Sequence, residues 1–125
     1  MEDATRDQIR QNASRMDIRD LVRELTRSVG ATVVQTMAGV EDRTLPRGWA
    51  KPDGPDPGPV TEARLRLGYR VWKTLEMAEG RNVALAWLMG ANPRLGDDLP
   101  VLCIQQQNRE VVGAAEAFID DTYAV

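Results

Sequence analysis

Residues that commonly carry enzyme chemistry are scarce in this chain. It has no histidine and a single cysteine, Cys103. The usual nitrogen and sulfur ligand sets for zinc or copper therefore cannot be assembled, and triad-type nucleophilic catalysis lacks its usual base. Most carboxylates stand beside basic residues or at expected helix starts, so only a mechanism run by carboxylates alone would remain. We predict a binding protein rather than an enzyme, with no catalytic residue, metal or cofactor.

Charged residues are unevenly distributed along the chain. Positions 43–73 hold seven Lys or Arg and three acidic residues, a local net charge of +4. Positions 97–125 hold six acidic residues and one arginine, a local net charge of −5. Such a separation predicts two ends with different partners, one of them a polyanion. The alternative is that both runs are merely solvated helix faces.

Length and composition are those of a globular protein. A chain of 125 residues with a hydrophobic fraction of 42% fits one ordinary domain or two small helical subdomains. No apolar run approaches the ~18 residues that a membrane-spanning helix needs. Residues 1–15 lack the apolar stretch of a signal peptide, and one cysteine excludes an internal disulfide. We therefore expect a cytoplasmic protein without a membrane partner.

In the N-terminal half, the pattern predicts a polar arm or frayed helix over residues 1–16, followed by a helix over Ile18–Val29. Asp17 is a suitable N-cap for this helix, and Gly30 ends it. Residues 31–40 are too short and too isolated for a strand. They are predicted to form a short buried helix.

The middle of the chain is rich in turn formers. Asp42 is expected to cap a helix that starts at Arg43 and holds Pro46 in its first turn, where the missing N–H of proline costs little. Trp49 is expected to close this helix onto the core. Four prolines and two glycines within residues 52–60 then predict an extended linker.

The C-terminal half shows clearer helical periodicity. A long helix is predicted over Thr61–Glu79, because this segment carries two neighbouring apolar stripes and must pack on two sides. The stripes consist of Leu67, Val71, Leu75 and Ala78, and of Leu65, Tyr69 and Trp72. Gly80 ends the helix. We expect it to bridge the two halves of the molecule.

Three shorter helices are predicted after the long one. The first should point three side chains inward: Val83, Trp87 and Leu88. The second, after a loop, should be capped by Asp98 with Pro100 in its first turn, and the third should span Arg109–Thr122. Cys103 is expected to be an inert buried thiol. The aromatic residues on apolar faces are expected to be core residues; they are Trp72, Trp87 and Phe118.

Residues 86–120 form a pattern that resembles a known family. The segment AWLMGANPRLGDDLPVLCIQQQNREVVGAAEAFID is similar to the toxin-binding domain of the Xre/MbcA/ParS antitoxin family. The matching positions are Trp87, Leu88, Gly90, Asn92, Pro93, Leu95, Gly96, Pro100, Leu102, Val111 and Phe118. Residues 21–51 resemble, more weakly, the degenerate Xre-type helix-turn-helix that accompanies this domain, with Gly30-Ala31 at the turn and Trp49-Ala50 closing the last helix.

This resemblance, which covers residues 20–120, implies a fold and a partner. The implied fold is all-α, with a helix-turn-helix region over residues 17–51 packed on a toxin-binding domain over residues 61–125. The implied partner is a RES-domain toxin, an NAD-consuming enzyme whose active site the antitoxin occludes. Antitoxins of this family form homodimers within a larger toxin–antitoxin complex, and that complex often binds operator DNA.

Two sets of candidate binding residues follow from the resemblance. For operator DNA they are Arg43, Thr44, Arg47 and Lys51, with added phosphate contacts from Arg64, Arg66 and Arg70. For the toxin they are Asp120, Asp121, Tyr123 and Val125 in the last helix and tail, with Asn92 and Arg94 in the Asn-Pro turn. Acidic residues near a helix C-terminus oppose the macrodipole, so a positively charged partner is expected to receive Asp120 and Asp121. The alternative is that the tail residues are only solvated.

The chain departs from the family pattern in two places. Gln107, Asn108 and Arg109 stand where many relatives have a glycine turn, and Asn108 is expected to adopt the left-handed conformation there. Pro46 and Gly48 shorten the usable surface of the expected recognition helix. The rival interpretation is a stand-alone helix-turn-helix transcriptional regulator without a toxin partner, which would not need the acidic C-terminal third.

Overall fold

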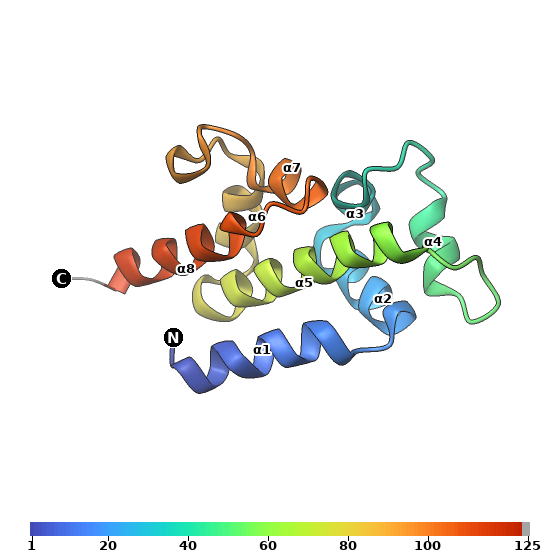
Figure 1. The fold of residues 1–125 in the computed structure, drawn as a ribbon, viewed down its shortest axis with the longest axis horizontal. Coiled ribbons are helices and arrows are strands. Elements are labelled where there is room, and N and C mark those ends of the chain that lie inside the picture. Colours follow the sequence, from blue (N-terminus) through green and yellow to red (C-terminus); the bar gives the residue numbers. More distant parts are fainter. Residues whose placement is uncertain (124–125) are drawn as a thin grey trace.

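The computed structural model describes the backbone of residues 1–123 and the side chains of residues 1–121. Within that part the chain is all helical, as predicted, with eight α-helices, one short 3-10 helix and no β-strand (Figure 1). In chain order the elements are α1 (Asp3–Arg15), α2 (Ile18–Val29), α3 (Ala31–Ala38), α4 (Leu45–Ala50), α5 (Pro59–Glu79), α6 (Arg81–Met89), η1 (Pro93–Leu95), α7 (Pro100–Gln105) and α8 (Glu110–Tyr123).

Helix α5 lies at the centre of the fold (Figure 1). It contacts α1, α2, α3, α6, α7 and α8. Both predicted apolar stripes are buried, apart from the half-buried Ala78. The prediction of a long helix that packs on more than one side is therefore confirmed. The helix begins at Pro59, two residues earlier than predicted, because proline suits the first turn, where no amide proton is needed.

Helix α2 and the turn after it agree with the sequence prediction. The Asp17 carboxylate accepts a hydrogen bond of 3.2 Å from the Asp20 backbone N–H and so caps the helix. Gly30 ends α2 with a φ of +89°, a conformation that favours glycine, and α3 starts at the next residue. The apolar side of α2 is fully buried through Leu21, Val22 and Leu25.

Residues 3–15 form a regular helix, whereas the sequence predicted a polar arm or a frayed helix. Helix α1 packs against α5 and buries Ile9 and Ala13. The Arg66 guanidinium of α5 also donates hydrogen bonds to the carbonyls of Ala13 (3.1 Å) and Met16 (2.8 Å) at the end of α1. The prediction failed because only two residues of the helix are fully buried, and the hydrogen bonds from Arg66 that also hold it leave no pattern in the sequence.

Helix α4 begins at Leu45, two residues later than predicted. The Asp42 carboxylate accepts hydrogen bonds from the Thr44 hydroxyl (2.6 Å) and from the Thr44 backbone N–H (2.9 Å). It therefore closes a turn ahead of the helix instead of capping it. The hydrogen bond from the hydroxyl, followed by that from the backbone, lowers the pKa of Asp42. Pro46 lies in the first turn and Trp49 is buried, both as predicted.

The turn between α7 and α8 uses a different residue from the one predicted. Gln107, with a φ of +56°, adopts the left-handed conformation that was assigned to Asn108. The N–H groups of Gln107 and Asn108 donate to the carbonyls of Ile104 and Cys103, both at 2.9 Å, and so end α7. The Asn108 side chain accepts a hydrogen bond from the Glu110 N–H at the start of α8. The turn therefore forms without a glycine.

Three further details of the C-terminal half bear on the site. Val83 is 41% exposed and does not point inward as predicted; Ala84 and Leu88 form the buried side of α6. Leu99, not Asp98, occupies the N-cap position of α7. Cys103 is buried as predicted, and burial raises the pKa of its thiol. None of the helices formed by residues 1–123 is long and apolar enough to cross a membrane.

Candidate functional site

A groove of about 430 Å³ opens between α6, η1 and α8. Its lining residues are Trp87, Asn92, Pro93, Arg94, Ala114, Phe118 and Asp121. The rings of Trp87 and Phe118 lie 6.4 Å apart between centroids and are tilted by 52° to each other, a favourable arrangement for an aromatic pair. The groove therefore combines an aromatic pair with an exposed cation and an exposed carboxylate.

The Asn-Pro turn forms one side of this groove. The Asn92 side chain accepts a hydrogen bond of 2.9 Å from the Arg94 backbone N–H and caps η1. The Asn92 backbone N–H donates to the Asp98 carbonyl (3.1 Å), and its carbonyl accepts from the Asp97 N–H (2.9 Å). These bonds close the loop into a compact turn. Asn92 is therefore engaged in the turn itself, while Arg94 projects into solvent.

Two arginines receive the acidic residues at the end of α8. Arg94 Nη2 lies 3.3 Å from Asp121 Oδ2. Arg6 of α1 pairs with Asp120 (2.6 Å) and with Glu116 (2.8 Å). The hydrogen bond to Asp120 is the main reason why the pKa of Arg6 is raised. Cations of this chain therefore already neutralise these carboxylates, and their position at the helix end does not require a positively charged partner.

The structure brings together three of the six predicted toxin-binding residues. Asn92, Arg94 and Asp121 line one groove. Asp120 is not among the lining residues and points toward α1, where Arg6 holds it. The side chain of Tyr123 and all of Val125 lie outside the described residues, so the structure gives these two predictions no position.

A second candidate surface lies at the start of α4. Arg43, Thr44 and Arg47 line a recess of about 280 Å³ together with Ala31 and Thr32 from the first turn of α3. Three of the four predicted DNA-binding residues therefore lie together. The fourth, Lys51, is the exposed C-cap residue at the other end of α4 and does not line the recess.

Two of the three arginines of α5 that were expected to contact DNA phosphates bind groups of this chain instead. The Arg64 guanidinium donates to the Ala38 carbonyl (2.9 Å) and so satisfies the end of α3. Arg66 is engaged with α1 and with Glu62. Both arginines therefore support neighbouring helices. Arg70 makes no side-chain hydrogen bond or ion pair with any residue that the structure describes.

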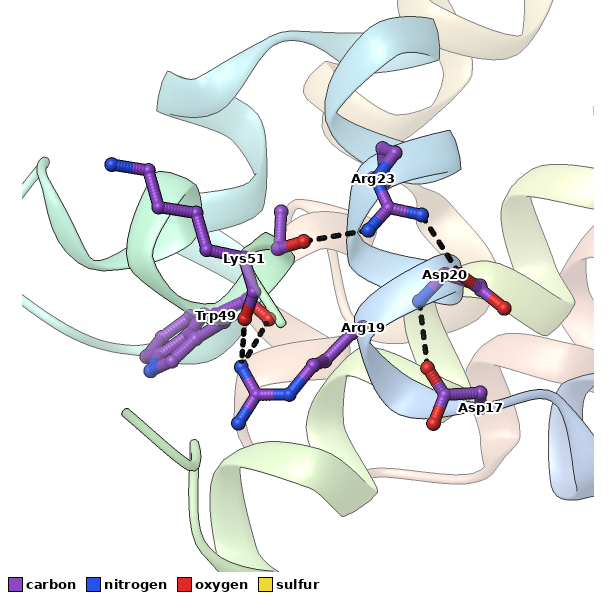
Figure 2. A network of polar contacts seen from close by, with 7 residues as sticks. Asp17, Arg19, Asp20, Arg23, Trp49 and Lys51 are labelled. Atoms are coloured by element: carbon purple, nitrogen blue, oxygen red, sulfur yellow. Dashed lines mark hydrogen bonds and ion pairs between the residues drawn. The ribbon is translucent and has the colours of Figure 1, made fainter. Parts of the chain in front are cut away.

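Two arginines of α2, not singled out from the sequence, hold α4 in place (Figure 2). The Arg19 guanidinium donates to the carbonyls of Trp49 (3.1 Å), Lys51 and Gly54 (2.9 Å). Arg23 donates to the Ala50 carbonyl (2.8 Å) and pairs with Asp20. These donors satisfy carbonyls at the end of α4 that have no helical partner. They also fasten the proline-rich loop to α2.

Three aromatic residues were predicted to belong to the core, and the prediction holds in full only for Trp72, which is buried. Trp87 and Phe118 pack against the core but are only half-buried, and they line the groove. The sequence did contain a signal. Trp87 stands one position before Leu88 and Phe118 one position before Ile119, so each lies off the centre of its buried stripe.

Among residues 1–123 no group of three or more cysteine or carboxylate side chains could hold a metal ion. Comparisons with protein families, with curated proteins and with solved structures gave no match for this chain.

Proposed function

We propose that this chain is an antitoxin that binds a RES-domain toxin through the groove between α6, η1 and α8. One observation carries the proposal. The predicted residues Arg94, in the Asn-Pro turn, and Asp121, near the end of α8, lie 27 positions apart in the sequence, yet both line this groove and form an ion pair of 3.3 Å.

The chemistry of the groove fits a protein partner. Tryptophan and arginine are the residue types most enriched at the energetic centres of protein interfaces, and Trp87 and Arg94 both line it. Trp87 and Phe118 retain exposed ring surface that a partner can bury. The groove lacks the polar groups that catalysis needs, because the described residues that line it include no base beside a nucleophile.

The exposed ion pair in the groove can be exchanged for contacts with a partner at little cost. The side chains of Arg94 and Asp121 are 58% and 69% exposed, and such pairs contribute only ~0–1 kcal/mol to stability. Opening the pair frees one cation and one carboxylate for a toxin. The antitoxin would then act by occlusion of the toxin's active site, for which affinity and geometry suffice.

Co-expression tests this function. A RES-domain toxin encoded in the same operon should stop growth and lower cellular NAD when expressed alone, and the full-length chain should restore both. Trp87→Ala should reduce this protection, whereas Asn82→Ala, at an exposed position of the same helix that does not line the groove, should not. A neighbouring gene that is harmless alone, or equal protection by both variants, would contradict the proposal.

Operator binding is a second part of the same proposal, and one observation favours it. The cations Arg43 and Arg47 are exposed and line one recess with Thr44, so side chains for phosphates and for base edges lie together. Helix α4 is only six residues long, which limits the surface that can enter a groove of DNA. Arg47→Gln should weaken binding of the toxin–antitoxin complex to its promoter and lower the salt dependence.

The rival function is a transcriptional regulator that has no toxin. It predicts that the isolated chain forms a tight, sequence-specific operator complex and that no toxin gene adjoins it. A homodimer is compatible with both functions, and exposed apolar side chains such as Met77 and Met89 offer surface for one. Analytical ultracentrifugation of the free chain and of the complex would establish the stoichiometry.

A further inference from the structure

A third surface recess differs in composition from both candidate sites. It has a volume of about 240 Å³ and lies between α1 and the first half of α5, beside the turn that precedes α8. Four of its eight lining residues are arginines, namely Arg10, Arg66, Arg70 and Arg109. The described residues that line it include no carboxylate. We refer to these four residues as the arginine pocket.

Two of the four guanidinium groups in the arginine pocket have no described partner that neutralises them. Arg70 and Arg109 form no side-chain hydrogen bond or ion pair with any described residue. Arg66 pairs with Glu62 through Nε (3.1 Å) and donates to two carbonyls through Nη1, which leaves its Nη2 without a described partner. Arg10 has only its exposed pair with Asp7, at 3.2 Å.

The electrostatics of Arg70 agree with this account. Burial lowers the pKa of its guanidinium, Glu116 opposes that shift, and the positive charges of Arg109 and Arg10 add to it. Glu116 is itself paired with Arg6 of α1. Positive charges that lie close together and are partly removed from water repel one another, and a bound anion relieves this repulsion. The pocket is therefore suited to a ligand with negative charge.

We propose that the arginine pocket binds the phosphate group of a small phosphorylated ligand. The planar guanidinium fork matches phosphate oxygens with two parallel hydrogen bonds, and several such forks converge here. The Ser14 side chain also lines the pocket and offers a further polar contact. The volume is below the ~300–1,000 Å³ of drug-sized sites, which favours a compact anion.

This site is separate from both proposed binding surfaces. It shares no lining residue with the groove of Trp87 and Phe118 or with the recess of Arg43 and Arg47. The ligand would touch α1, α5 and Arg109, the residue directly before α8. It would therefore link the helix that carries the groove to the centre of the fold, and its binding does not depend on the antitoxin proposal.

Titration calorimetry of the full chain with pyrophosphate, at ~0.15 M ionic strength, tests the site. The proposal predicts saturable binding with one site per chain. Arg70→Gln and Arg109→Gln should each weaken it roughly tenfold or more, since a hydrogen bond to a charged group is lost. The matched control is Arg27→Gln, because Arg27 of α2 is exposed, carries the same charge and does not line the pocket. Circular dichroism should show that each variant remains folded.

Three outcomes would overturn the proposal. The first is the absence of saturable pyrophosphate binding by the wild-type chain. The second is an equal loss from Arg27→Gln, which would reduce the effect to net charge. The third comes from a parallel titration with duplex DNA: if only DNA binds and the two pocket variants weaken that binding, the arginines serve a nucleic-acid backbone instead. Because Arg109 is exposed, its variant reports on the ligand even if Arg70→Gln unfolds.

Discussion

Helices α4 and α8 each carry one candidate binding surface, but they are held to the fold in different ways. Helix α8 buries Val111, Ala115 and Ile119, each with no exposed surface, against the rest of the protein. Helix α4 buries Pro46 and Trp49, packs Leu45 and Ala50 against the core, and is also held by hydrogen bonds from Arg19 and Arg23 of α2. The groove therefore rests on apolar packing, and the basic recess rests on a shorter apolar contact reinforced by polar contacts.

The comparison implies that the two surfaces differ in rigidity. Apolar burial contributes ~25 cal/mol per Å², and the cost of losing it is shared by the whole core. Hydrogen bonds to partly exposed carbonyls can be replaced by water and so contribute less. We expect the groove to open only when the protein unfolds, and the region of α4 to open locally more often.

The largest effect should come from the packing of α8. Ile119→Ala should lower the free energy of unfolding by ~2–5 kcal/mol, because a fully buried side chain is replaced by a cavity. Urea denaturation measures this. Val83→Ala, at an exposed position, should change stability by less than about 0.5 kcal/mol. A small effect at Ile119 would contradict the view that packing supports the groove.

Two glycines allow a matched test of the two regions. A Cβ at Gly54 would lie 1.8 Å from the Gly48 carbonyl oxygen, so Gly54→Ala must push the proline-rich loop away from α4. We expect a loss of ~1–3 kcal/mol, as in overpacked sites. Nothing lies within 4 Å of a Cβ at Gly113 in α8, and Gly113→Ala should stabilise the protein by ~0.5–1 kcal/mol. Changes in the free energy of unfolding of the same sign for both variants would contradict the contrast between the loop beside α4 and helix α8.

Removal of the arginine that fastens α4 should have a smaller and local effect. Arg19→Gln should lower the free energy of unfolding by only ~1 kcal/mol, because water can donate hydrogen bonds to the carbonyls that lose the guanidinium. Amide hydrogen exchange should become faster over residues 45–54 and remain unchanged over residues 111–119. Arg27→Gln on the same helix is the control. Equal acceleration in both segments would show that α4 is part of the core.

The smallest effect on stability should come from the ion pair in the groove. Arg94→Gln should change the free energy of unfolding by less than ~1 kcal/mol, because both side chains are exposed. The same variant should slow association with the toxin, since a charge at the edge of an interface acts mainly on the association rate. Surface plasmon resonance separates the two rates, and unchanged association would remove Arg94 from the interface.

The contrast between α4 and α8 also explains what the sequence could and could not predict. The buried residues of α8 and α5 recur with helical periodicity, so both helices were predicted, and for α5 the buried stripes as well. Arg19 donates to carbonyls 30 to 35 positions away, which leaves no periodic signal. The same reason explains α1, where Arg66 supplies much of the support.

The candidate site was predicted in part, for similar reasons. Asn92 and Arg94 follow from the Asn-Pro turn, and Asp121 from the acidic end of α8. The intramolecular pairing of Asp120 with Arg6 spans 114 positions and could not be inferred from composition. Trp87 and Phe118 were assigned to the core because each falls on an apolar helix face. In the fold the two rings instead lie side by side, 6.4 Å apart between centroids, and both remain half-buried at the groove.

The most direct test of the account is the affinity of the purified full-length chain for a RES-domain toxin from the same operon. We predict a tight complex that Trp87→Ala weakens by at least ~2 kcal/mol, as expected for an aromatic residue at the centre of an interface, while Asn82→Ala leaves it unchanged. Both variants should keep the wild-type circular dichroism spectrum. A complex that tolerates Trp87→Ala, or the absence of any complex, would contradict the central claim.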